Sequence, residues 1–244
     1  MDKKYYQKPY YNLYFVRHGE SIGNRYGLLG GWTDVPLSDA GRKGLEDLVD
    51  KLPYPEADLY LYSGLKRAQE TLEIIRGKGH DPRPDWRFSE TFFGLMEASP
   101  PEEDELRPNF YLNFYHDVYQ GFGEETFTDQ RTRVLTGTRD LLEDLKNKQL
   151  NSAYVFSHYG TIKSNLASFT GQTTDDLLDL WIPNGSLWHF MFEEQNDGSA
   201  DSGVVAGFVC RLIQAYYLGY ETKELTRQVL LNSYGLSDEE TLLP

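Results

Sequence analysis

Two short apolar runs, each followed by a histidine and then a glycine, constrain this chain more than any other feature. The first run covers residues 12–16 and leads directly into RHG at residues 17–19. The second covers residues 153–156 and leads into SHYG at residues 157–160. Short runs of aromatic and β-branched residues bounded by polar residues and glycine predict buried strands. The chain therefore carries two predicted strands that end in similar chemical groups.

The carboxyl ends of these two strands are the candidate ligand site. Ligands of open α/β sheets bind in the crevice outside the carboxyl ends of the strands. Arg17 and His18 follow the first strand and His158 follows the second, so neighbouring strands would bring a guanidinium and two imidazoles together. Each histidine taken singly also has a plain structural explanation, because histidine is often partly buried. The occurrence of two such strand ends, which together carry Arg17, His18 and His158, is what indicates a site for an anion.

Between and after these runs the sequence alternates predicted helices and strands. Apolar residues at helical spacing, capping residues and glycines at the ends define the helices, and short apolar runs define the strands. The expected elements are a helix capped by Ser38, a strand over 59–62, a helix capped by Ser63, a long helix over 126–148, a short helix ending at Gly171, a strand over 186–192, antiparallel strands with a turn at 196–198 and alternation over 206–212, and a final helix ending at Gly235.

Composition narrows the classes of protein. The 244 residues carry a net charge of −14, which argues against a nucleic-acid partner, since such binding relies on cations that contact phosphates. No apolar run is long enough for a membrane span, and no export signal is visible. The single Cys210 cannot form an internal disulfide, which fits the reducing cytoplasm. We therefore expect a cytoplasmic protein of one or two domains.

Four separated blocks resemble the histidine phosphatase superfamily, the phosphoglycerate mutase-like enzymes. They are residues 17–21 (RHGES) with Asn24, residues 62–71 (YSGLKRAQET), residues 87–97 (RFSETFFGLME) and residues 184–186 (NGS). The resemblance implies a three-layer α/β/α sandwich, with a mostly parallel sheet and an antiparallel edge strand. It also implies a single domain over residues 1–244, with an insertion at about 98–122 and a C-terminal helical extension at about 218–244.

The resemblance assigns five catalytic positions: Arg17, His18, Arg67, Glu90 and His158. Neutral imidazole is nucleophilic near pH 7, so His18 can attack phosphorus and form a phosphohistidine. Arg17, Arg67 and His158 would stabilise the charge on the phosphoryl oxygens, and Glu90 would act as acid and then as base. A bound phosphate would also explain Arg67 near a helix N-terminus, where a cation is otherwise unfavourable. The expected substrate contacts are Ser21, Asn24, Gly30, Gly31 and Tyr159, with no metal and no cofactor.

Three functions fit these residues. We favour a metal-independent phosphatase of a small phosphorylated metabolite; a cofactor-dependent phosphoglycerate mutase and a non-catalytic phosphate-binding or interaction module are the alternatives. The sequence of residues 31–38 (GWTDVPLS) resembles that of the mutases. Residues 91–94 lack the basic and aromatic sequence of mutases, and the acidic residues 100–105 offer no paired arginines for a second phosphate, with Arg107 a lone candidate. The expected partner is a small phosphate ester, with neither nucleic acid nor membrane; the sequence does not specify an oligomeric state.

The segment over residues 99–121 is expected to form a lid over the sheet edge, outside the core. We expect its aromatic residues Phe110, Tyr111, Phe114 and Tyr115 to line the substrate side, because clustered apolar side chains mark binding surfaces. Such a lid would select monophosphates with an uncharged or apolar remainder. The other histidines lack a partner at metal-ligand or triad spacing and are expected to be structural; they are His80, His116 and His189.

Overall fold

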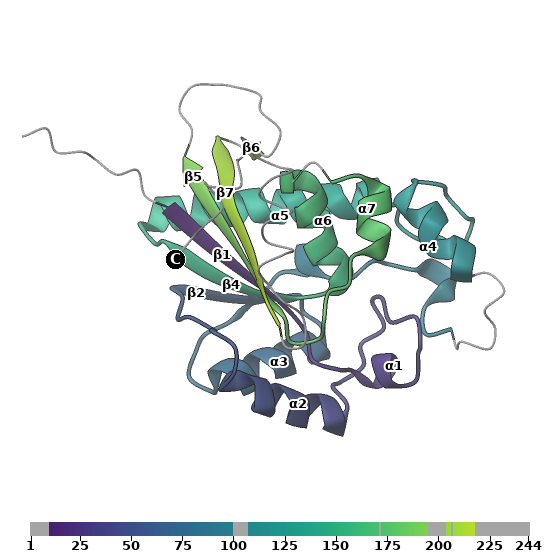
Figure 1. Ribbon diagram of the computed structural model, residues 1–244, viewed down its shortest axis with the longest axis horizontal. Coiled ribbons are helices and arrows are strands. Elements are labelled where there is room, and N and C mark those ends of the chain that lie inside the picture. Colours follow the sequence, from purple (N-terminus) through teal and green to yellow (C-terminus); the bar gives the residue numbers. More distant parts are fainter. Residues whose placement is uncertain (1–9, 100–106, 171, 195–203, 206, 218–244) are drawn as a thin grey trace, which may run out of the picture.

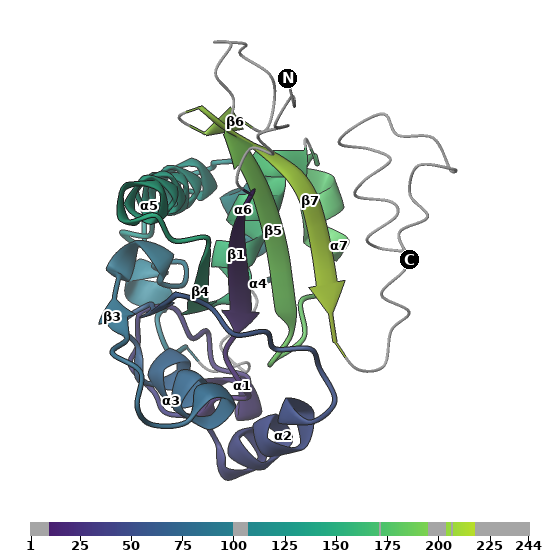
Figure 2. The same ribbon diagram turned by 90° about the vertical axis from the view of Figure 1, so that its left-hand side faces the viewer.

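The computed structural model describes residues 10–99, 107–170, 172–194, 204–205 and 207–217. Within these residues one sheet of seven strands has the order β3-β2-β4-β1-β5-β7-β6. The strands are β1 (Tyr10–Arg17), β2 (Leu59–Tyr62), β3 (Arg83–Pro84), β4 (Ser152–Ser157), β5 (Leu187–Glu194), β6 (Val204–Val205) and β7 (Phe208–Tyr216). In Figure 2, β1, β5 and β7 lie side by side.

The strands β3, β2, β4 and β1 are parallel, and β5 and β7 continue the sheet in antiparallel pairings. β1 pairs with β4 in a register that places Val16 opposite Phe156 and Arg17 opposite Ser157. The two predicted strands are therefore neighbours, and the residues that follow them meet at one edge of the sheet. The predicted α/β class, mostly parallel with antiparallel strands at one side, is confirmed.

Helices cover both faces of the sheet, which gives three layers (Figure 1). They are α1 (Ile22–Arg25), α2 (Asp39–Val49), α3 (Lys66–Arg76), α4 (Arg107–Tyr115), α5 (Phe127–Lys148), α6 (Tyr159–Thr170) and α7 (Thr174–Asp179), with short 3-10 turns at Trp86–Phe88 and Gly94–Met96. α2 and α3 lie on one face, and α5 and α6 lie on the other.

The alternation of side chains along β1 explains why residues 13–16 (LYFV) are all apolar or aromatic. Leu13 and Phe15 are buried in the core on the α5 and α6 face, whereas Val16 packs in the core on the α2 and α3 face. Successive side chains of a strand point to opposite faces, so a strand that is covered on both faces needs apolar residues at nearly every position. This central strand thereby fixes the position of the residues that follow it.

Two sequence predictions about local structure are wrong in part. Ser63 does not cap α3: the helix has its N-cap at Leu65 without a side-chain hydrogen bond, because Gly64, at a φ of 88°, separates Ser63 from the first turn. The aromatic segment is also not outside the core. Phe114 and Tyr115 are 3% and 4% exposed and belong to the main core, because α4 packs its aromatic side against Phe127 at the start of α5.

Several expectations lie outside the described residues: the turn at 196–198, the final helix ending at Gly235 and the acidic run over 100–105. The division into one domain with a lid and a C-terminal extension stays a prediction. Within the residues that the structure describes, no helix is long and apolar enough to cross a membrane.

Candidate active site

The two histidines predicted to meet lie side by side. Their ring centroids are 5.0 Å apart, and both side chains are buried, with 3% of His18 and none of His158 exposed. The main-chain N–H of His18 donates to the Ser157 carbonyl at 3.0 Å, and the side-chain amide of Asn184 donates to the His18 carbonyl at 2.8 Å. The strand ends therefore hold His18 firmly in place.

The surroundings of His18 define its charge and its tautomer. Its Nδ1 lies 2.6 Å from the Gly19 carbonyl oxygen. Because a carbonyl can only accept, Nδ1 carries the hydrogen and Nε2 keeps its lone pair. Burial, followed by the nearby Arg67 and Arg17 charges, holds the pKa of His18 well below 6.5. The imidazole is therefore neutral at neutral pH, with a nucleophilic Nε2.

His158 is held through the hydroxyl of Ser63. Its Nε2 lies 2.6 Å from Ser63 Oγ, and its Nδ1 has no hydrogen-bond partner among the described residues. Burial and then the charge of Arg67 lower the pKa of His158 well below 6.5. Ser63 was predicted to be a helix cap, and its place directly after β2 is the signal that could have assigned it to the site.

The two predicted arginines are both buried at the site, with 7% of Arg17 and 1% of Arg67 exposed. The Arg17 guanidinium donates to the Ile182 carbonyl. Arg67 donates from Nη2 to the Gly31 carbonyl at 2.6 Å and from Nη1 to the Thr33 carbonyl at 3.0 Å. Burial lowers the pKa of Arg67 to about 10, against the charge of Glu90 that raises it. Arg67 therefore stays charged at neutral pH.

The loop that contains Gly30 and Gly31 is fastened to a second carboxylate, Glu97. The main-chain N–H groups of Trp32 and Thr33 donate to Glu97 at 2.8 and 2.9 Å. A Cβ on Gly31 would lie 2.1 Å from Glu97 Oε1, whereas a Cβ on Gly30 would meet no atom nearer than 3.9 Å. Only Gly31 is thus required by close approach; Gly30 is placed at the site through its main chain.

The Glu90 carboxylate rests on the first turn of α6. Its Oε1 accepts hydrogen bonds from the main-chain N–H groups of Thr91 and Gly160, both at 2.9 Å. These two N–H groups fix the position of Oε1 at the start of α6. No hydrogen bond joins Oε2 to any of the described residues, and Glu90 lines the cavity described below. Glu90 is therefore placed to exchange a proton with a group in that cavity.

Arg133 of α5 clamps the main chain around Glu90. Its guanidinium donates to the carbonyls of Arg87 at 2.9 Å, Ser89 at 3.0 Å and Glu90 at 3.2 Å, and it pairs with Glu125 at 2.5 Å. The carbonyl of Glu90 also accepts from the Trp32 indole at 2.8 Å. The sequence predicts only a long helix over 126–148, and helical spacing alone contains no signal for this role of Arg133.

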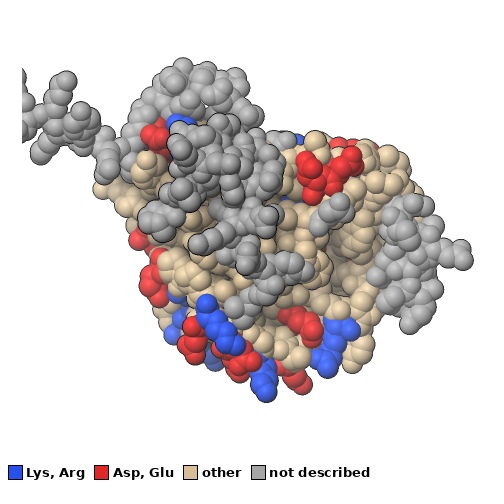
Figure 3. Space-filling model, viewed as in Figure 1, with Lys and Arg blue, Asp and Glu red and all other residues tan. Residues whose placement is uncertain are grey.

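A cavity of about 340 Å³ opens beside these groups. Among the predicted site residues it is lined by Arg17, Asn24, Gly30, Glu90 and Tyr159. His18, Ser21, Gly31, Arg67 and His158 are not part of its lining. On the face shown in Figure 3, the surface between α7 and α1 consists mainly of uncharged side chains. The predicted lid contributes Tyr111, Phe114 and Tyr115 to the lining, but Phe110 is buried against Phe93 instead.

Ser21 and Asn24 have different parts at the start of α1. Ser21 is the N-cap residue, and its hydroxyl accepts from the Asn24 main-chain N–H at 3.1 Å. The Asn24 side-chain oxygen accepts from the Ser21 N–H at 3.1 Å and from Asn184 at 3.4 Å. These bonds orient the Asn24 amide at the cavity, so Ser21 supports Asn24 rather than lining the cavity itself.

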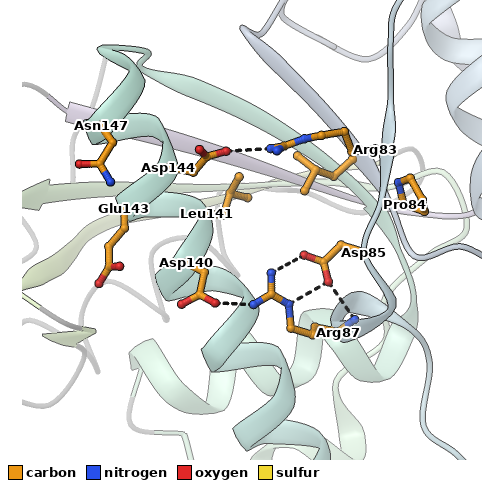
Figure 4. Close-up of a pocket in the computed structure, with 10 residues that line it drawn as sticks. Arg83, Pro84, Asp85, Arg87, Asp140, Leu141, Glu143, Asp144 and Asn147 are labelled. Atoms are coloured by element: carbon orange, nitrogen blue, oxygen red, sulfur yellow. Dashed lines mark hydrogen bonds and ion pairs between the residues drawn. The ribbon is translucent and has the colours of Figure 1, made fainter.

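A second cavity, of about 430 Å³, lies between β3 and α5 (Figure 4). Its arginines are paired with carboxylates: Arg87 contacts Asp85 at 2.6 Å and Asp140 at 2.5 Å, and Arg83 contacts Asp144 at 2.9 Å. It contains none of the predicted site residues. These ion pairs fasten the segment before Glu90 to α5. In the described part of the chain, no group of three or more His, Cys, Asp or Glu side chains could hold a metal ion.

Comparison with known proteins identifies the class that this fold and site define. Residues 13–200 match the sequence profile of the histidine phosphatase superfamily, branch 1. The chain belongs to this superfamily.

The individual relatives have two different activities in their names. A 2,3-bisphosphoglycerate-dependent phosphoglycerate mutase of Borreliella burgdorferi is 27% identical over 252 residues, which covers 87% of this chain and 94% of that protein. The mutase of Pseudoalteromonas atlantica is 38% identical over 104 residues, and the match spans 43% of its length. The structure of a candidate alpha-ribazole-5'-P phosphatase of Escherichia coli K-12 has a TM-score of 0.62 at 21% identity, covers 86% of this chain and 99% of that one, and shows the shared fold.

Proposed function

We propose that this protein is a metal-independent phosphomonoesterase of a small phosphorylated metabolite, acting through a phosphohistidine. The observation that carries the proposal is the state of His18: a buried, neutral imidazole whose Nδ1–H is bound by the Gly19 carbonyl. Such a group is a nucleophile that needs no separate base. No cofactor is required.

The first step transfers the phosphoryl group to the enzyme. The lone pair of His18 Nε2 attacks phosphorus, the bond between phosphorus and the ester oxygen breaks, and protonated Glu90 gives its proton to the leaving alkoxide. The guanidinium groups of Arg17 and Arg67 and the imidazole of His158 donate to the equatorial oxygens, on which the charge is spread. Removal of one such preorganised donor typically slows a reaction about 100- to 1,000-fold.

The second step restores the enzyme. The Glu90 carboxylate takes a proton from water as the water attacks phosphorus, the bond to Nε2 breaks, and phosphate leaves with His18 neutral again. Asn24, Gly30 and Tyr159 supply the proposed substrate contacts in the cavity. Burial raises the pKa of Tyr159 to about 12, so its phenol stays neutral. Ser21 and Gly31 act by shaping the residues around these contacts.

The phosphoglycerate mutase is the second candidate, and the names of the relatives favour it. Among the described residues of the cavity lining, the cations are Arg17 and Lys163. The Lys163 ammonium donates to the Leu177 carbonyl and lies 4.4 Å from the Tyr159 ring centroid. A bisphosphate would need further cations to hold its second phosphate while it reorients. The small number of cations among the described lining residues therefore supports the phosphatase over the mutase. The non-catalytic alternative has least support, because all five catalytic positions are filled.

A direct comparison of the two activities tests the proposal. The unmodified protein is incubated with a panel of phosphomonoesters and with 3-phosphoglycerate plus 2,3-bisphosphoglycerate. We expect phosphate release from the esters to exceed interconversion of the phosphoglycerates. Faster interconversion than release would establish the mutase instead. A cytoplasmic location and the absence of nucleic-acid and membrane partners remain predictions from composition.

A further inference from the structure

We propose that the esters taken by this cavity carry a planar aromatic ring on their alcohol side, and that Trp181 selects this ring. The inference rests on the proposed function, because it concerns the leaving group of the phosphatase reaction. It adds a substrate class and a specificity residue to that function.

Aromatic side chains form a large part of the wall of the cavity. Six of its fifteen lining residues are Phe, Tyr or Trp. Phe93, Phe114 and Tyr115 are at most 4% exposed and contribute through the core, whereas Tyr111 is 40% and Trp181 is 57% exposed. Large aromatic side chains exposed around a cavity are typical of surfaces that bind a ligand. The half-exposed pair is therefore the part of the wall that a bound group can still cover.

Trp181 lies beside the group proposed to hold the phosphoryl oxygens. The Arg17 guanidinium carbon is 5.6 Å from the centroid of the Trp181 ring, and Arg17 also donates to the carbonyl of the next residue, Ile182. A substituent on the ester oxygen of a phosphate held by Arg17 therefore begins close to the indole. Ring pairs interact over centroid distances of about 4.5–7 Å, so a ring a few bonds from phosphorus can reach Trp181.

The orientation of Trp181 favours a flat partner over a merely apolar one. Its ring is held edge-on to Tyr159 at 6.2 Å, and Tyr159 is itself fixed, because its hydroxyl donates to the Leu180 carbonyl at 2.7 Å. The indole plane is thus oriented by its contacts with Tyr159 and Arg17. A planar ring can stack on such a plane, whereas a puckered ring of equal size loses part of the contact.

Three esters of primary alcohols separate stacking from simple apolar burial. They are 2-phenylethyl, 2-cyclohexylethyl and ethyl phosphate, whose alkoxide leaving groups are closely matched. The measured quantity is the ratio of kcat/KM for the phenyl ester to that for the cyclohexyl ester. Cyclohexyl is at least as apolar as phenyl, so burial alone predicts a ratio of one or less. We expect a ratio of about three to ten, the range that one aromatic pair adds beyond its burial.

Two variants assign the preference to one residue. Trp181→Leu should lower the ratio to about one, and Trp181→Phe should keep most of it. Any loss of rate that is common to both esters cancels in the ratio. Trp86→Leu is the matched control, because Trp86 is 60% exposed and lies outside the cavity lining; it should keep the ratio of the unmodified protein.

The outcomes distinguish this inference from the function on which it rests. A ratio of one or less in the unmodified protein, or one that survives Trp181→Leu, overturns the inference while ethyl phosphate is still hydrolysed. Absence of phosphate release from all three esters overturns the proposed function, and the inference with it. If a variant fails to fold, the ratio of kcat/KM for the phenyl and cyclohexyl esters, measured on the unmodified protein, still tests the preference for a planar ring.

Discussion

Replacing Arg133 by lysine should slow phosphoryl transfer from ethyl phosphate far more than transfer from 4-nitrophenyl phosphate. The Arg133 guanidinium donates to the carbonyls of Arg87, Ser89 and Glu90. It also pairs with Glu125. Lysine keeps the positive charge, but an ammonium group lacks the planar fork that spans these acceptors. The main chain that carries Glu90 would lose its clamp, while the charge opposite Glu125 would remain.

The size of the effect follows from the task of Glu90. A positioned general acid contributes roughly 100- to 10,000-fold, so partial displacement should cost ethyl phosphate about 10- to 100-fold in kcat/KM. Nitrophenolate leaves without a proton, so its ester should lose less than about threefold. The quantity kcat/KM reports the steps up to the phosphoenzyme, which keeps the later hydrolysis step out of the comparison.

The assay compares initial rates of both esters for the unmodified protein, Arg133→Lys and a control. Arg131→Lys is the control, because Arg131 is an exposed residue of the same helix that bonds Ser168 Oγ at 2.9 Å and does not touch the Glu90 segment. It should leave both rates unchanged. An equal loss on both esters in Arg133→Lys would refute the reasoning, since a general loss of stability makes no distinction between leaving groups.

Three further predictions concern separate features. Gly160→Ala would place a Cβ 2.4 Å from Glu90 Oε1 and should reduce kcat/KM for ethyl phosphate at least about tenfold, whereas Gly44→Ala in open space on α2 should keep activity. Burial lowers the pKa of His189 to about 4. As the pH falls, His189 therefore binds a proton in the unfolded chain at a higher pH than in the folded protein, which favours unfolding. From pH 7 to pH 4 the free energy of unfolding should fall by about 3 kcal/mol relative to His189→Phe. Denaturant titrations with an equal difference at both pH values would contradict this. Phosphatase activity should survive EDTA; full loss with rescue by a divalent ion would overturn the metal-independent mechanism.

The sequence was sufficient for the framework of the site. The apolar runs before His18 and His158 predicted neighbouring strands, because a strand covered on both faces leaves a strong local pattern. The resemblance in four blocks then located Arg67 and Glu90, which the structure places at the same strand ends. These features depend on residues that are close together in the chain or follow a strand directly.

The remaining parts depend on contacts between distant segments. Ser63 was predicted to be a helix cap, because a serine before a helix is the local pattern of a cap. Its hydrogen bond to His158 joins residues 95 positions apart, which no local pattern shows. Arg133 lies on α5, where the spacing of apolar residues shows only which face of the helix is buried. Its contacts with the Glu90 segment therefore leave no pattern in the nearby sequence. Tyr115 was placed outside the core, since composition cannot show that α4 packs against Phe127.

The central claim is that His18 carries the phosphoryl group, and trapping that intermediate tests it most directly. The variant Glu90→Gln is loaded with 4-nitrophenyl phosphate, whose leaving group needs no acid, so the first step proceeds while the second lacks its base. Intact mass is then measured after a quench that avoids acid. We predict one added phosphoryl group in Glu90→Gln and none in the double variant His18→Ala, Glu90→Gln. An adduct that persists without His18, or undiminished turnover in the single variant His18→Ala, would contradict the account.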